Sequence, residues 1–570
     1  MRIKILNLTI IFIFLFLIFG LLNSQIIQGA KFKELSNRNC IRLIPQNGSR
    51  GKILDTQGNV IVDSSISYDV VILLQDMEQI DKTLMELSRI FNIDFEELKE
   101  RFIAGFVAPS VPVTILKNIG SKKAAALEEE KFALDSVIVQ PTTVRYYPYG
   151  KLASHVIGYI NEIDRWRLTE LSDYGYKTKD LVGFGGVEEK YDYYLRQEDG
   201  GLSVEVDHGG RFTRVLGFKP PRSGKDLQLT LDLRIQKIAE DVLGDRSGSV
   251  IVMNPESGEI IAMASSPDFN PDVFVKKSGN SIRGLFNDSG APLLNRAISG
   301  AFPPGSVFKL IVATAALETG KINSNTRYLC TGGITVGGRQ FNCWDKHGEQ
   351  NLLQAIAHSC NVFFYKTGLL IGPQLMHDYA VRLGLSKTTS IELPYETAGV
   401  VVDPLWEKIY KFRRWYQGDT ANFAIGQGEL LATPLQLTRM MAVFANNGRF
   451  VTPYIVKAIE GKDVSSRHRR IADLHFKAGT INKIREGLRA VVSDSGGTAH
   501  ILSDLPVDVA GKTGTAQTSS GSPHGWCLGF FPFQNPKFVI CVFLEHGGSG
   551  YAAVAATKKI IESMLQEKLL

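Results

Sequence analysis

The chain has 570 residues, of which 44% are hydrophobic and 21% are charged, and its formal net charge is +6. This length suits two to four domains. So mild a charge, without a basic stripe interleaved with aromatics, argues against a nucleic-acid partner, and six cysteines are too few for a disulfide framework.

An uncharged apolar run of 18 residues, Ile5 to Leu22, follows the N-terminal MRIK. It is just long enough to span a bilayer as a helix. The alternative is a cleaved signal peptide. The apolar core of a signal peptide is usually only about 7–15 residues long. In addition, a cleavage site after Ala30 would require a small residue at position 28, where this sequence has Gln28. The sequence therefore predicts an uncleaved anchor over residues 1–24. Basic residues flank both sides of the run and leave its orientation open.

The composition of the rest of the chain changes near GFKPPRSGKD, Gly217 to Asp226. The Pro, Gly and charged residues of this segment are typical of a linker. Before it, strand-like runs such as YDVVILL and VPVTIL alternate with charged helical stretches such as DKTLMELSRIFNIDFEELKERF. After it, LQLTLDLRIQKIAEDVL indicates a strand running into a helix. We predict a mixed α/β (α+β) chain with one domain over 25–225 and a second over 226–570.

The segment GAFPPGSVFKLIVATAALETG carries the first chemical motif, S-x-x-K. Its Pro-Pro-Gly stops any preceding element, and a helical pattern then runs to Gly320. Ser306 is expected in the first turn of that helix, with Lys309 on the same face. A buried lysine can lose its proton and activate a serine hydroxyl, while the helix N-terminus offers N–H groups to a developing anion. Alone the motif is weak, because a capped helix with a solvated lysine has the same pattern.

A second motif, Ser359-Cys360-Asn361, lies at a predicted helix junction, where a hydroxyl and an amide two residues apart can turn into one cleft. By itself S-x-N is also a common turn or cap. The K-T-G triplet that starts at Lys366 follows within a few residues. Its apolar surroundings indicate the same helix, so Lys366 is interpreted as structural.

The other K-T-G triplet, Lys512-Thr513-Gly514, lies in PVDVAGKTGTAQTSS, whose alternation is typical of a strand with one open face. A strand edge can bind an extended peptide through its main chain. Its lysine and hydroxyl can hold a carboxylate, and Gly514 lets the backbone approach a ligand closely. We interpret this second triplet as the functional one.

The order S-x-x-K, S-x-N, K-T-G-T resembles that of penicillin-binding proteins. The resemblance covers nearly the whole chain and is to the class B members, which are membrane-anchored D,D-transpeptidases. RGKILDTQGNVIVDS resembles the pedestal motif R-G-x-I-x-D-R-x-G, with Thr56 in place of the usual arginine. RYYPYGKLASHVIGYI, GFGGVEEKYDYYLRQEDGG and FAIGQGELLATPLQL are also family-like, and WYQGDT is more similar to elongation-type than to septal members.

The resemblance implies a role for each site residue. Ser306 would attack the D-Ala-D-Ala carbonyl and form an acyl-enzyme, with Lys309 as its base. Ser359 would pass a proton to the leaving D-alanine, and Asn361 would orient Lys309. Lys512, with substrate-binding residues around it, would hold the terminal carboxylate; those residues are Thr513, Gly514 and Thr515. The oxyanion hole would be formed by the N–H groups of Ser306 and Thr515.

The resemblance also implies partners and a location. These are D-Ala-D-Ala stem peptides with an amine acceptor, β-lactams, the membrane, a SEDS-type glycosyltransferase and rod-complex scaffold proteins. The catalytic domain would lie outside the cytoplasmic membrane on a single-pass anchor. Alternatives are a septal transpeptidase, a β-lactamase, against which a pedestal of about 190 residues argues, and a non-catalytic β-lactam-binding scaffold or sensor. A scaffold would be expected to lose a motif, and a sensor would normally need more membrane spans or a cytoplasmic domain.

Cys330, Cys343 and His347 lie in a Gly-rich loop, and Cys360 lies within the S-x-N motif. No cofactor is required for the chemistry, but three or four such ligands can hold a structural zinc. Resemblance to elongation-type members, some of which carry a metal in this region, favours it. A Cys330–Cys343 disulfide, natural in an oxidising compartment, is the competing interpretation.

Overall fold

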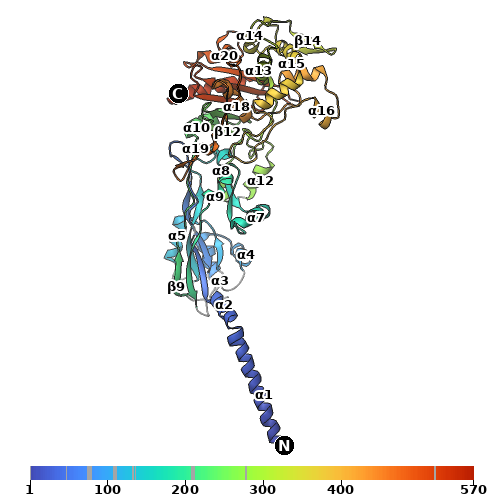
Figure 1. Cartoon of the computed structure of the whole chain (residues 1–570). Helices are drawn as coiled ribbons and strands as arrows, with labels where there is room; N and C mark the ends of the chain where they lie inside the picture. Colours follow the sequence, from blue (N-terminus) through green and yellow to red (C-terminus); the bar gives the residue numbers. More distant parts are fainter. Residues whose placement is uncertain are drawn as a thin grey trace. The chain divides into compact units, whose positions relative to one another are not determined.

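The computed structural model describes residues 2–46, 48–72, 80–106, 112–130, 134, 136–206, 212–276, 279–518 and 521–570 (Figure 1). Contacts between residues group the chain into two compact units. The first consists of Met1–Gly51, Ser64–Arg145 and Arg196–Gly224, and the second of Lys52–Asp63, Tyr146–Leu195 and Lys225–Leu570. The mixed α/β fold predicted from the sequence is confirmed, because strands and helices alternate in both units.

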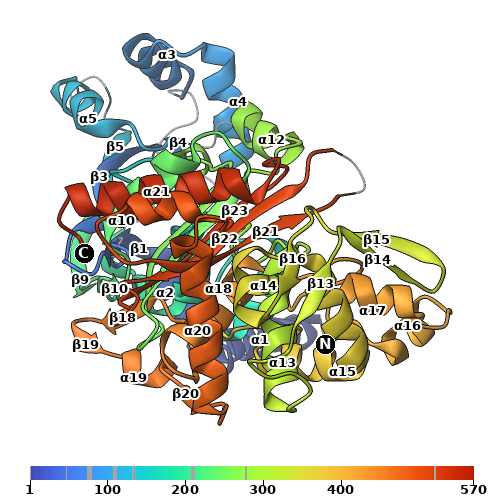
Figure 2. The same cartoon turned by 90° about the horizontal axis from the view of Figure 1, so that it is seen from above.

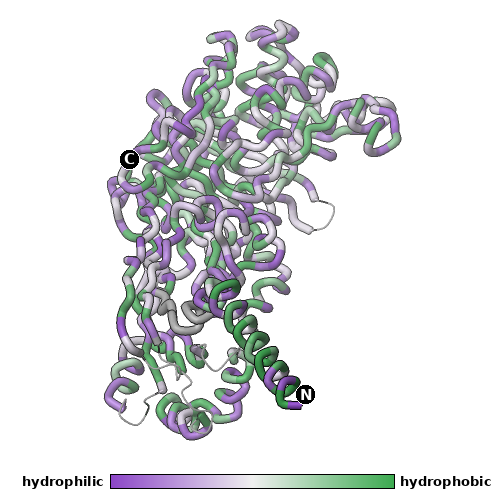
Figure 3. The backbone as a smooth tube through the Cα atoms, turned by 60° about the horizontal axis from the view of Figure 1, so that its bottom comes forward, coloured by the Kyte–Doolittle hydropathy of each residue, from purple (hydrophilic) through white to green (hydrophobic). Residues whose placement is uncertain are grey.

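The apolar N-terminal run forms the helix α1, Arg2–Leu22, and a π-helical turn, Asn23–Ile27, continues it. No residue of α1 is buried, and Figure 3 shows it as hydrophobic along most of its length, with hydrophilic residues next to the N-terminus. Within the part of the chain that the structure describes, Arg2–Ile27 is the one helix long and apolar enough to cross a membrane, by length and composition.

The first unit packs amphipathic helices on short strands. Leu84, Leu87 and Phe91 lie on one face of α3, because their spacing follows the helical repeat, and they share a core with Val70 and Ile72 of β3. The elements of this unit are α2 Gly29–Cys40, β1 Ile41–Gln46, β3 Val60–Ile72 (whose first residues belong to the second unit), α3 Ile80–Phe91, α4 Phe95–Gly105, β4 Val113–Leu116, α5 Gly120–Glu129, β5 Val137–Tyr146, β8 Gly200–Val206 and β9 Phe212–Lys219. The predicted strands are confirmed in β3 and β4, while their ends at 73, 74 and 111 lie outside the described residues.

The second unit is built on a five-stranded antiparallel sheet with the order β12-β11-β23-β22-β21. The bounds are β11 Gly248–Met253, β12 Ile260–Ser266, β21 Ala510–Ala516, β22 His524–Phe531 and β23 Phe538–Leu544. Every residue of β11, β22 and β23 is buried. Strands buried on both faces need helices on both sides. Strand β21 lies at the sheet edge, as predicted for the second K-T-G triplet.

Helices cover both faces of this sheet (Figure 2). The helices α10, Leu233–Leu243, and α21, Gly550–Gln566, contact each other and one face, whereas α18, Pro434–Ala445, and α20, Ala478–Ser493, contact the other. In α10 the Asp232 carboxylate caps the N-terminus by accepting the N–H of Arg234. The predicted strand-to-helix start of this domain is confirmed in β10, Leu227–Leu229, followed by α10.

The region expected to be a linker is partly a strand, since β9 extends to Lys219 and only the residues from Pro220 to Asp226 lie outside named elements. Pairing with β8 keeps Gly217–Lys219 extended.

The other elements of the second unit are β2 Ile53–Leu54, α6 Ser154–Ile157, β6 Tyr159–Glu162, α7 Arg165–Leu171, the 3₁₀ turn η4 Ser172–Tyr174, β7 Leu181–Phe184, α8 Gly186–Lys190, α9 Asp192–Leu195, α11 Asp272–Val275, α12 Gly279–Asn287, the 3₁₀ turn η5 Gly305–Phe308, α13 Lys309–Glu318, β13 Tyr328–Cys330, β14 Gly333–Val336, β15 Arg339–Asn342, β16 Gly348–Gln350, α14 Leu352–Ala357, α15 Asn361–Arg382, α16 Pro404–Tyr410, α17 Gln417–Ala424, β17 Arg449–Val451, β18 Val456–Ile459, β19 Lys462–Asp463, α19 Ser465–His468, β20 Ile471–Asp473 and the 3₁₀ turn η6 His500–Asp504.

Candidate active site

Ser306 lies in the 3₁₀ turn η5, and the α-helix α13 begins only at Lys309. The prediction of a first α-helical turn is thus corrected to a 3₁₀ turn that leads into the helix. Gly305 explains the arrangement: its φ is +54°, and a Cβ there would lie 2.7 Å from the carbonyl oxygen of Thr515. Only glycine lets the turn approach the edge strand β21 this closely.

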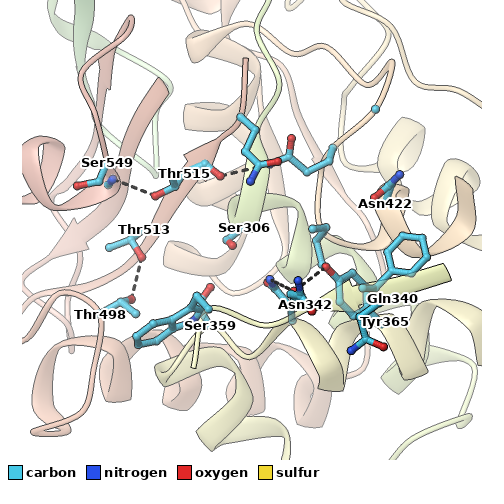
Figure 4. Close-up of a pocket in the computed structure, with 18 of the residues that line it drawn as sticks. Ser306, Gln340, Asn342, Ser359, Tyr365, Asn422, Thr498, Thr513, Thr515 and Ser549 are labelled. Atoms are coloured by element: carbon cyan, nitrogen blue, oxygen red, sulfur yellow. Dashed lines mark hydrogen bonds between the residues drawn. The ribbon is translucent and has the colours of Figure 1, made fainter. Parts of the chain in front are cut away.

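Ser306 lines a cleft of about 920 Å³. Figure 4 shows Ser306 between the β21 residues Thr513 and Thr515 on one side and Ser359 on the other. The three motifs predicted from sequence therefore meet at one cleft, although they are far apart along the chain. The three motifs can meet because β21 is an edge strand of the sheet. Its unpaired edge is therefore free to face the turn and helix that carry the other two motifs.

Lys309 is completely buried, as predicted from its apolar surroundings. Its Nζ donates to the Asn361 Oδ1 at 2.6 Å, to the Ser359 carbonyl at 2.8 Å and to the Ser359 Oγ at 3.2 Å. Burial lowers the pKa of this ammonium to about 8, against the smaller raising effect of nearby cysteine sulfurs. A lysine with such a pKa is neutral for part of the time near neutral pH and can accept a proton.

Ser359 stands between two lysines. It is buried and has a φ of +52°, a left-handed conformation that turns the chain between α14 and α15. Lys512 donates from the opposite side, with its Nζ 2.9 Å from the Ser359 Oγ and 3.1 Å from the Thr513 carbonyl. Burial, and then the charge of Lys309, hold the pKa of Lys512 well below its usual range.

The strand residues after Lys512 present polar groups to the cleft. The Thr513 hydroxyl bonds the Thr498 hydroxyl at 2.8 Å, and the Thr515 hydroxyl accepts the N–H of Gly550 at 3.0 Å. Gly514 packs tightly against η5, because a Cβ there would lie 3.0 Å from the Pro304 carbonyl oxygen and 3.1 Å from a methyl of Val307. Glycine at position 514 therefore allows β21 to pack closely against η5, the turn that carries Ser306.

The first K-T-G triplet is inside α15, which confirms the predicted helix. Lys366 is half-buried, and its Nζ lies 5.4 Å from the centre of the Tyr328 ring. It does not line the cleft. Its surroundings are those of a helix residue packed against an aromatic ring.

Several residues of the cleft were not singled out from the sequence. The Asn342 carbonyl accepts hydrogen bonds from the Asn361 amide at 3.3 Å and the Tyr365 hydroxyl at 3.2 Å. Gln427 donates to the Thr515 carbonyl at 3.4 Å. Asn342 and Tyr365 carry no motif that sequence alone could flag, whereas Gln427 lies within IGQG, whose two glycines mark a tight turn.

The suspected metal ligands also come together. One ligand atom from each of Cys330, Cys343, His347 and Cys360 lies within 4.8 Å of every other. The Nδ1 of His347 is 3.6 Å from the Cys330 sulfur and 3.5 Å from the Cys343 sulfur. The five cysteines whose side chains the structure describes are all free thiols, so the structure holds no Cys330–Cys343 disulfide.

This Cys₃His group fits a tetrahedral zinc. With Zn–S bonds near 2.3 Å and Zn–N bonds near 2.0–2.1 Å, two such ligand atoms would be about 3.5 Å apart, which matches the His347 distances. The Nε2 of His347 is buried without a hydrogen-bond partner among the described residues. The Cys343 sulfur accepts the N–H of Asn361 at 3.2 Å, and a hydrogen bond from the Cys360 thiol lowers the pKa of Cys343. The group thus touches the S-x-N motif directly.

Comparisons with known proteins agree with the site. Residues 248–566 match the model of the penicillin binding protein transpeptidase domain, and residues 45–229 match that of the penicillin-binding protein dimerisation domain. The chain is 31% identical to the peptidoglycan D,D-transpeptidase MrdA of Acinetobacter baumannii, over 95% of this chain and 84% of that protein.

Two solved structures are similar over nearly their whole length. A complex between the penicillin-binding protein PBP2 and MreC from Helicobacter pylori contains a chain with 28% identity and a TM-score of 0.84, covering 93% of this chain and 99% of that one. A structure described as showing how a peptidoglycan synthase complex coordinates polymerization and crosslinking contains a chain with 29% identity and a TM-score of 0.75, covering 99% and 98%.

Proposed function

From the premise that the chain belongs to the class B penicillin-binding proteins and is a PBP2-like peptidoglycan D,D-transpeptidase, we propose that it cross-links stem peptides during cell elongation through an acyl-enzyme on Ser306. The observation that carries this proposal is the bonding of Ser359 by two buried lysines, Lys309 and Lys512, beside the cleft that Ser306 lines.

In the acylation step, Lys309 in its neutral form takes the Ser306 hydroxyl proton while the oxygen attacks the penultimate D-alanine carbonyl. The N–H groups of Ser306 and Thr515 stabilise the oxyanion; one such donor is typically worth about 10²–10³ in rate. When the peptide bond breaks, Ser359 gives its proton to the leaving D-alanine nitrogen and is reprotonated from the lysines that bond it. Asn361, held by its 2.6 Å bond to Lys309, orients that lysine.

The substrate carboxylate is held by the Lys512 ammonium and by Thr513 and Thr515, with Gly514 between them. An amine of a neighbouring stem peptide then attacks the acyl-enzyme carbonyl. The proton that it loses passes through Ser359 to Lys309, which gives a proton to the Ser306 oxygen as that oxygen leaves. A β-lactam enters by the same acylation, but its ring-opened product stays tethered and shields the ester. It therefore inhibits the enzyme.

Intact mass spectrometry after mild penicillin treatment, followed by peptide mapping, tests the nucleophile. One adduct is expected, on the peptide that contains Ser306. Ser306→Ala should abolish the adduct and leave the melting temperature close to that of the parent, since the side chain only loses one hydroxyl. An adduct that persists in this variant would refute the assignment.

The elongation role is the finer part of the proposal. It is supported by the name of the MrdA relative and by the solved complex of PBP2 with MreC. Partners of this class, rod-complex scaffold proteins and a SEDS-type glycosyltransferase, would bind the anchor and the pedestal. Depletion of the protein in a rod-shaped host distinguishes the two class B roles: round cells are expected for an elongation enzyme, and filaments would assign it to the septum.

The location follows from the same premise. The single apolar helix Arg2–Ile27 suits a membrane anchor, and we propose that residues 1–24 provide the cytoplasmic tip and the span. The pedestal, 25–225, and the transpeptidase domain, 226–570, would then lie outside the cytoplasmic membrane, where the wall polymer is. Protease accessibility in spheroplasts measures this orientation: cleavage of the large domain without lysis is expected, and full protection would reverse it.

We also propose that the Cys330, Cys343, His347 and Cys360 group holds one structural zinc. The metal would fix the loop that carries Cys343 and, through the bond between the Asn361 N–H and the Cys343 sulfur, the start of α15. No catalytic step passes through it. Its contribution would be to keep Ser359 and Asn361 in register with Lys309.

Elemental analysis and a thiol count under denaturing conditions test the zinc. About one zinc per chain with all cysteines reactive is expected. His347→Ala should lose the metal and lower the melting temperature, while Cys541→Ala, at a buried cysteine of β23 outside the group, should keep it. Two blocked cysteines without zinc would restore the disulfide interpretation, and six free thiols without zinc would refute both.

A further inference from the structure

A second polar pocket, of about 700 Å³, opens in the second unit and shares no lining residue with the active-site cleft. We call it the basic pocket. Five arginine or lysine side chains line it: Arg382, Lys387, Arg439, Arg467 and Arg470. No Asp or Glu is among the described residues that line it. The proposed transpeptidase mechanism uses none of these residues.

The fold brings these cations together from separate segments. Arg382 ends α15, Lys387 lies in the loop after it, and Arg439 comes from α18. Arg467 lies in α19, and Arg470 directly precedes β20; both elements are labelled in Figure 2. The pairing of β17 with β20, extended by the bond from the Thr452 N–H to the Arg470 carbonyl, fixes this wall of the pocket.

Arg439 is the most buried of the five cations in the basic pocket. Only 9% of its surface is exposed, its Nε donates to the Val451 carbonyl at 2.8 Å, and its guanidinium lies 3.7 Å from the centre of the Phe450 ring. Within the described chain its two terminal nitrogens have no hydrogen-bond acceptor. A stacked, preorganised guanidinium with free N–H groups is well suited to bind an oxyanion.

Thr389 supplies an independent sign of a missing ligand. This residue lines the basic pocket and is 1% exposed, yet its hydroxyl has no hydrogen-bond partner among the described residues. A buried hydroxyl without a partner is unfavourable. The neighbouring residues Thr388 and Ser390, which also carry hydroxyl groups, line the pocket as well. An oxyanion at this wall would accept the hydrogen bond that Thr389 lacks.

Two carboxylates lie behind the wall and are already engaged. Glu396 accepts the N–H groups of Thr389 at 2.6 Å and Ser390 at 3.1 Å and is the acidic group that acts on Arg439. The Glu392 Oε2 accepts the N–H of Ile455 at 3.1 Å, and its Oε1 lies 3.1 Å from the Nδ1 of His468, which is also a lining residue. The five cations that line the pocket outnumber these two carboxylates, neither of which lines it. One carboxylate ligand would neutralise only one of these cations.

We propose that the basic pocket binds a phosphate-bearing ligand, with two neighbouring phosphates or one pyrophosphate as the unit it recognises. Phosphates offer several acceptor oxygens for the guanidinium groups and the hydroxyls, and two of them bring more negative charge to the five lining cations than one carboxylate would. The source can be a sugar pyrophosphate or a phosphorylated wall polymer, which share this chemistry. The proposal does not depend on the transpeptidase mechanism.

Calorimetric titration of the purified full-length protein with inorganic pyrophosphate tests it. We expect saturable one-to-one binding that weakens as salt rises. Arg467→Gln/Arg470→Gln, which changes two exposed side chains, should weaken binding at least tenfold. The control Arg283→Gln/Lys321→Gln removes the same charge at exposed positions outside the pocket and should change affinity less than twofold. Equal losses in both variants, or no binding by the parent protein, would overturn the proposal.

Thr389→Val isolates the hydroxyl. It should weaken pyrophosphate binding several-fold without lowering the melting temperature, since valine removes only a hydroxyl that lacks a partner. All these variants should react with penicillin at the parent rate, which separates this test from that of the active site. Citrate binding as tight as that of pyrophosphate would refute phosphate selectivity. Competition by uridine diphosphate N-acetylglucosamine would identify a sugar pyrophosphate as the source, and its absence would point to a phosphorylated polymer.

Discussion

Ser359 shows most clearly what residue identity contributes to this site. Its hydroxyl receives hydrogen bonds from two lysines whose positions are 50 and 153 residues away in the sequence. In each lysine, burial lowers the pKa of an ammonium group. The serine therefore connects two groups that can exchange protons, which a serine at an ordinary helix cap would not do.

The two K-T-G triplets give a residue-scale prediction. Lys512→Ala should slow penicillin acylation about 100-fold, the usual order for the loss of a positioned charge contact in an active site. Lys366→Ala should leave the rate within a factor of two, because Lys366 packs on Tyr328 outside the cleft. Stopped-flow measurement with a fluorescent penicillin decides it. Similar rate losses, in variants of equal thermal stability, would show that the triplets were assigned wrongly.

At the element scale, the glycines explain why one turn and one strand interlock. The main chain of η5 comes so close to β21 that a Cβ on Gly305 would touch the Thr515 carbonyl and one on Gly514 the Pro304 carbonyl. The Trp526 indole N–H adds a 3.0 Å bond to the Pro303 carbonyl. The turn that bears Ser306 is thus fixed to the strand that bears Lys512.

The helix α10 carries an element-scale prediction about pH. The Glu240 carboxylate accepts the N–H of Ala153 at 2.7 Å and the Gln236 amide at 2.8 Å, and burial raises its pKa to about 7. Between the ordinary value of 4.5 and about 7, the folded chain keeps a proton that the unfolded chain has lost. Stability therefore falls as pH rises through this window, and the cost is complete above pH 7.

Glu240→Gln removes this titration and keeps an acceptor oxygen. The variant should be more stable than the parent by about 3 kcal/mol at pH 8 and by little at pH 4.5. Thermal melts at both pH values measure the difference. Asp241→Asn, at an exposed neighbour on the same helix, should give no such pH-dependent gain. A stability difference that is equal at both pH values would contradict the assignment.

At the scale of the whole molecule, the sequence predicted individual helices and strands better than the order in which the strands pair. The helix at Lys309, the strand at Lys512 and the helix after Ser359 followed from local patterns of apolar residues, Pro and Gly. The sheet order did not, because β21 pairs with β22 nearby while β11 pairs with β23 about 290 residues later. Such distant pairings leave no local signal.

The grouping of segments was equally invisible in the sequence. Residues 52–63 and 146–195 belong to the same compact unit as the transpeptidase segments. The cations of the basic pocket likewise come from α15, the loop after it, α18, α19 and the residue before β20. Individually each is an ordinary surface or helix residue, and only tertiary contact brings them together. The cysteine group was predictable because its members crowd into one loop and one motif.

The lowered pKa values of the two lysines at Ser359 have a further consequence, for the heat of ligand binding. A carboxylate arriving at Lys512 favours the charged form of that lysine, so a proton must be drawn from the solvent as the complex forms. The apparent binding enthalpy of an acyl-D-Ala-D-Ala peptide to Ser306→Ala should therefore differ between Tris and phosphate buffers of equal pH, in proportion to their ionisation enthalpies. Lys512→Ala should remove most of the difference. Identical heats in the two buffers would mean that the site holds its carboxylate with charges already in place.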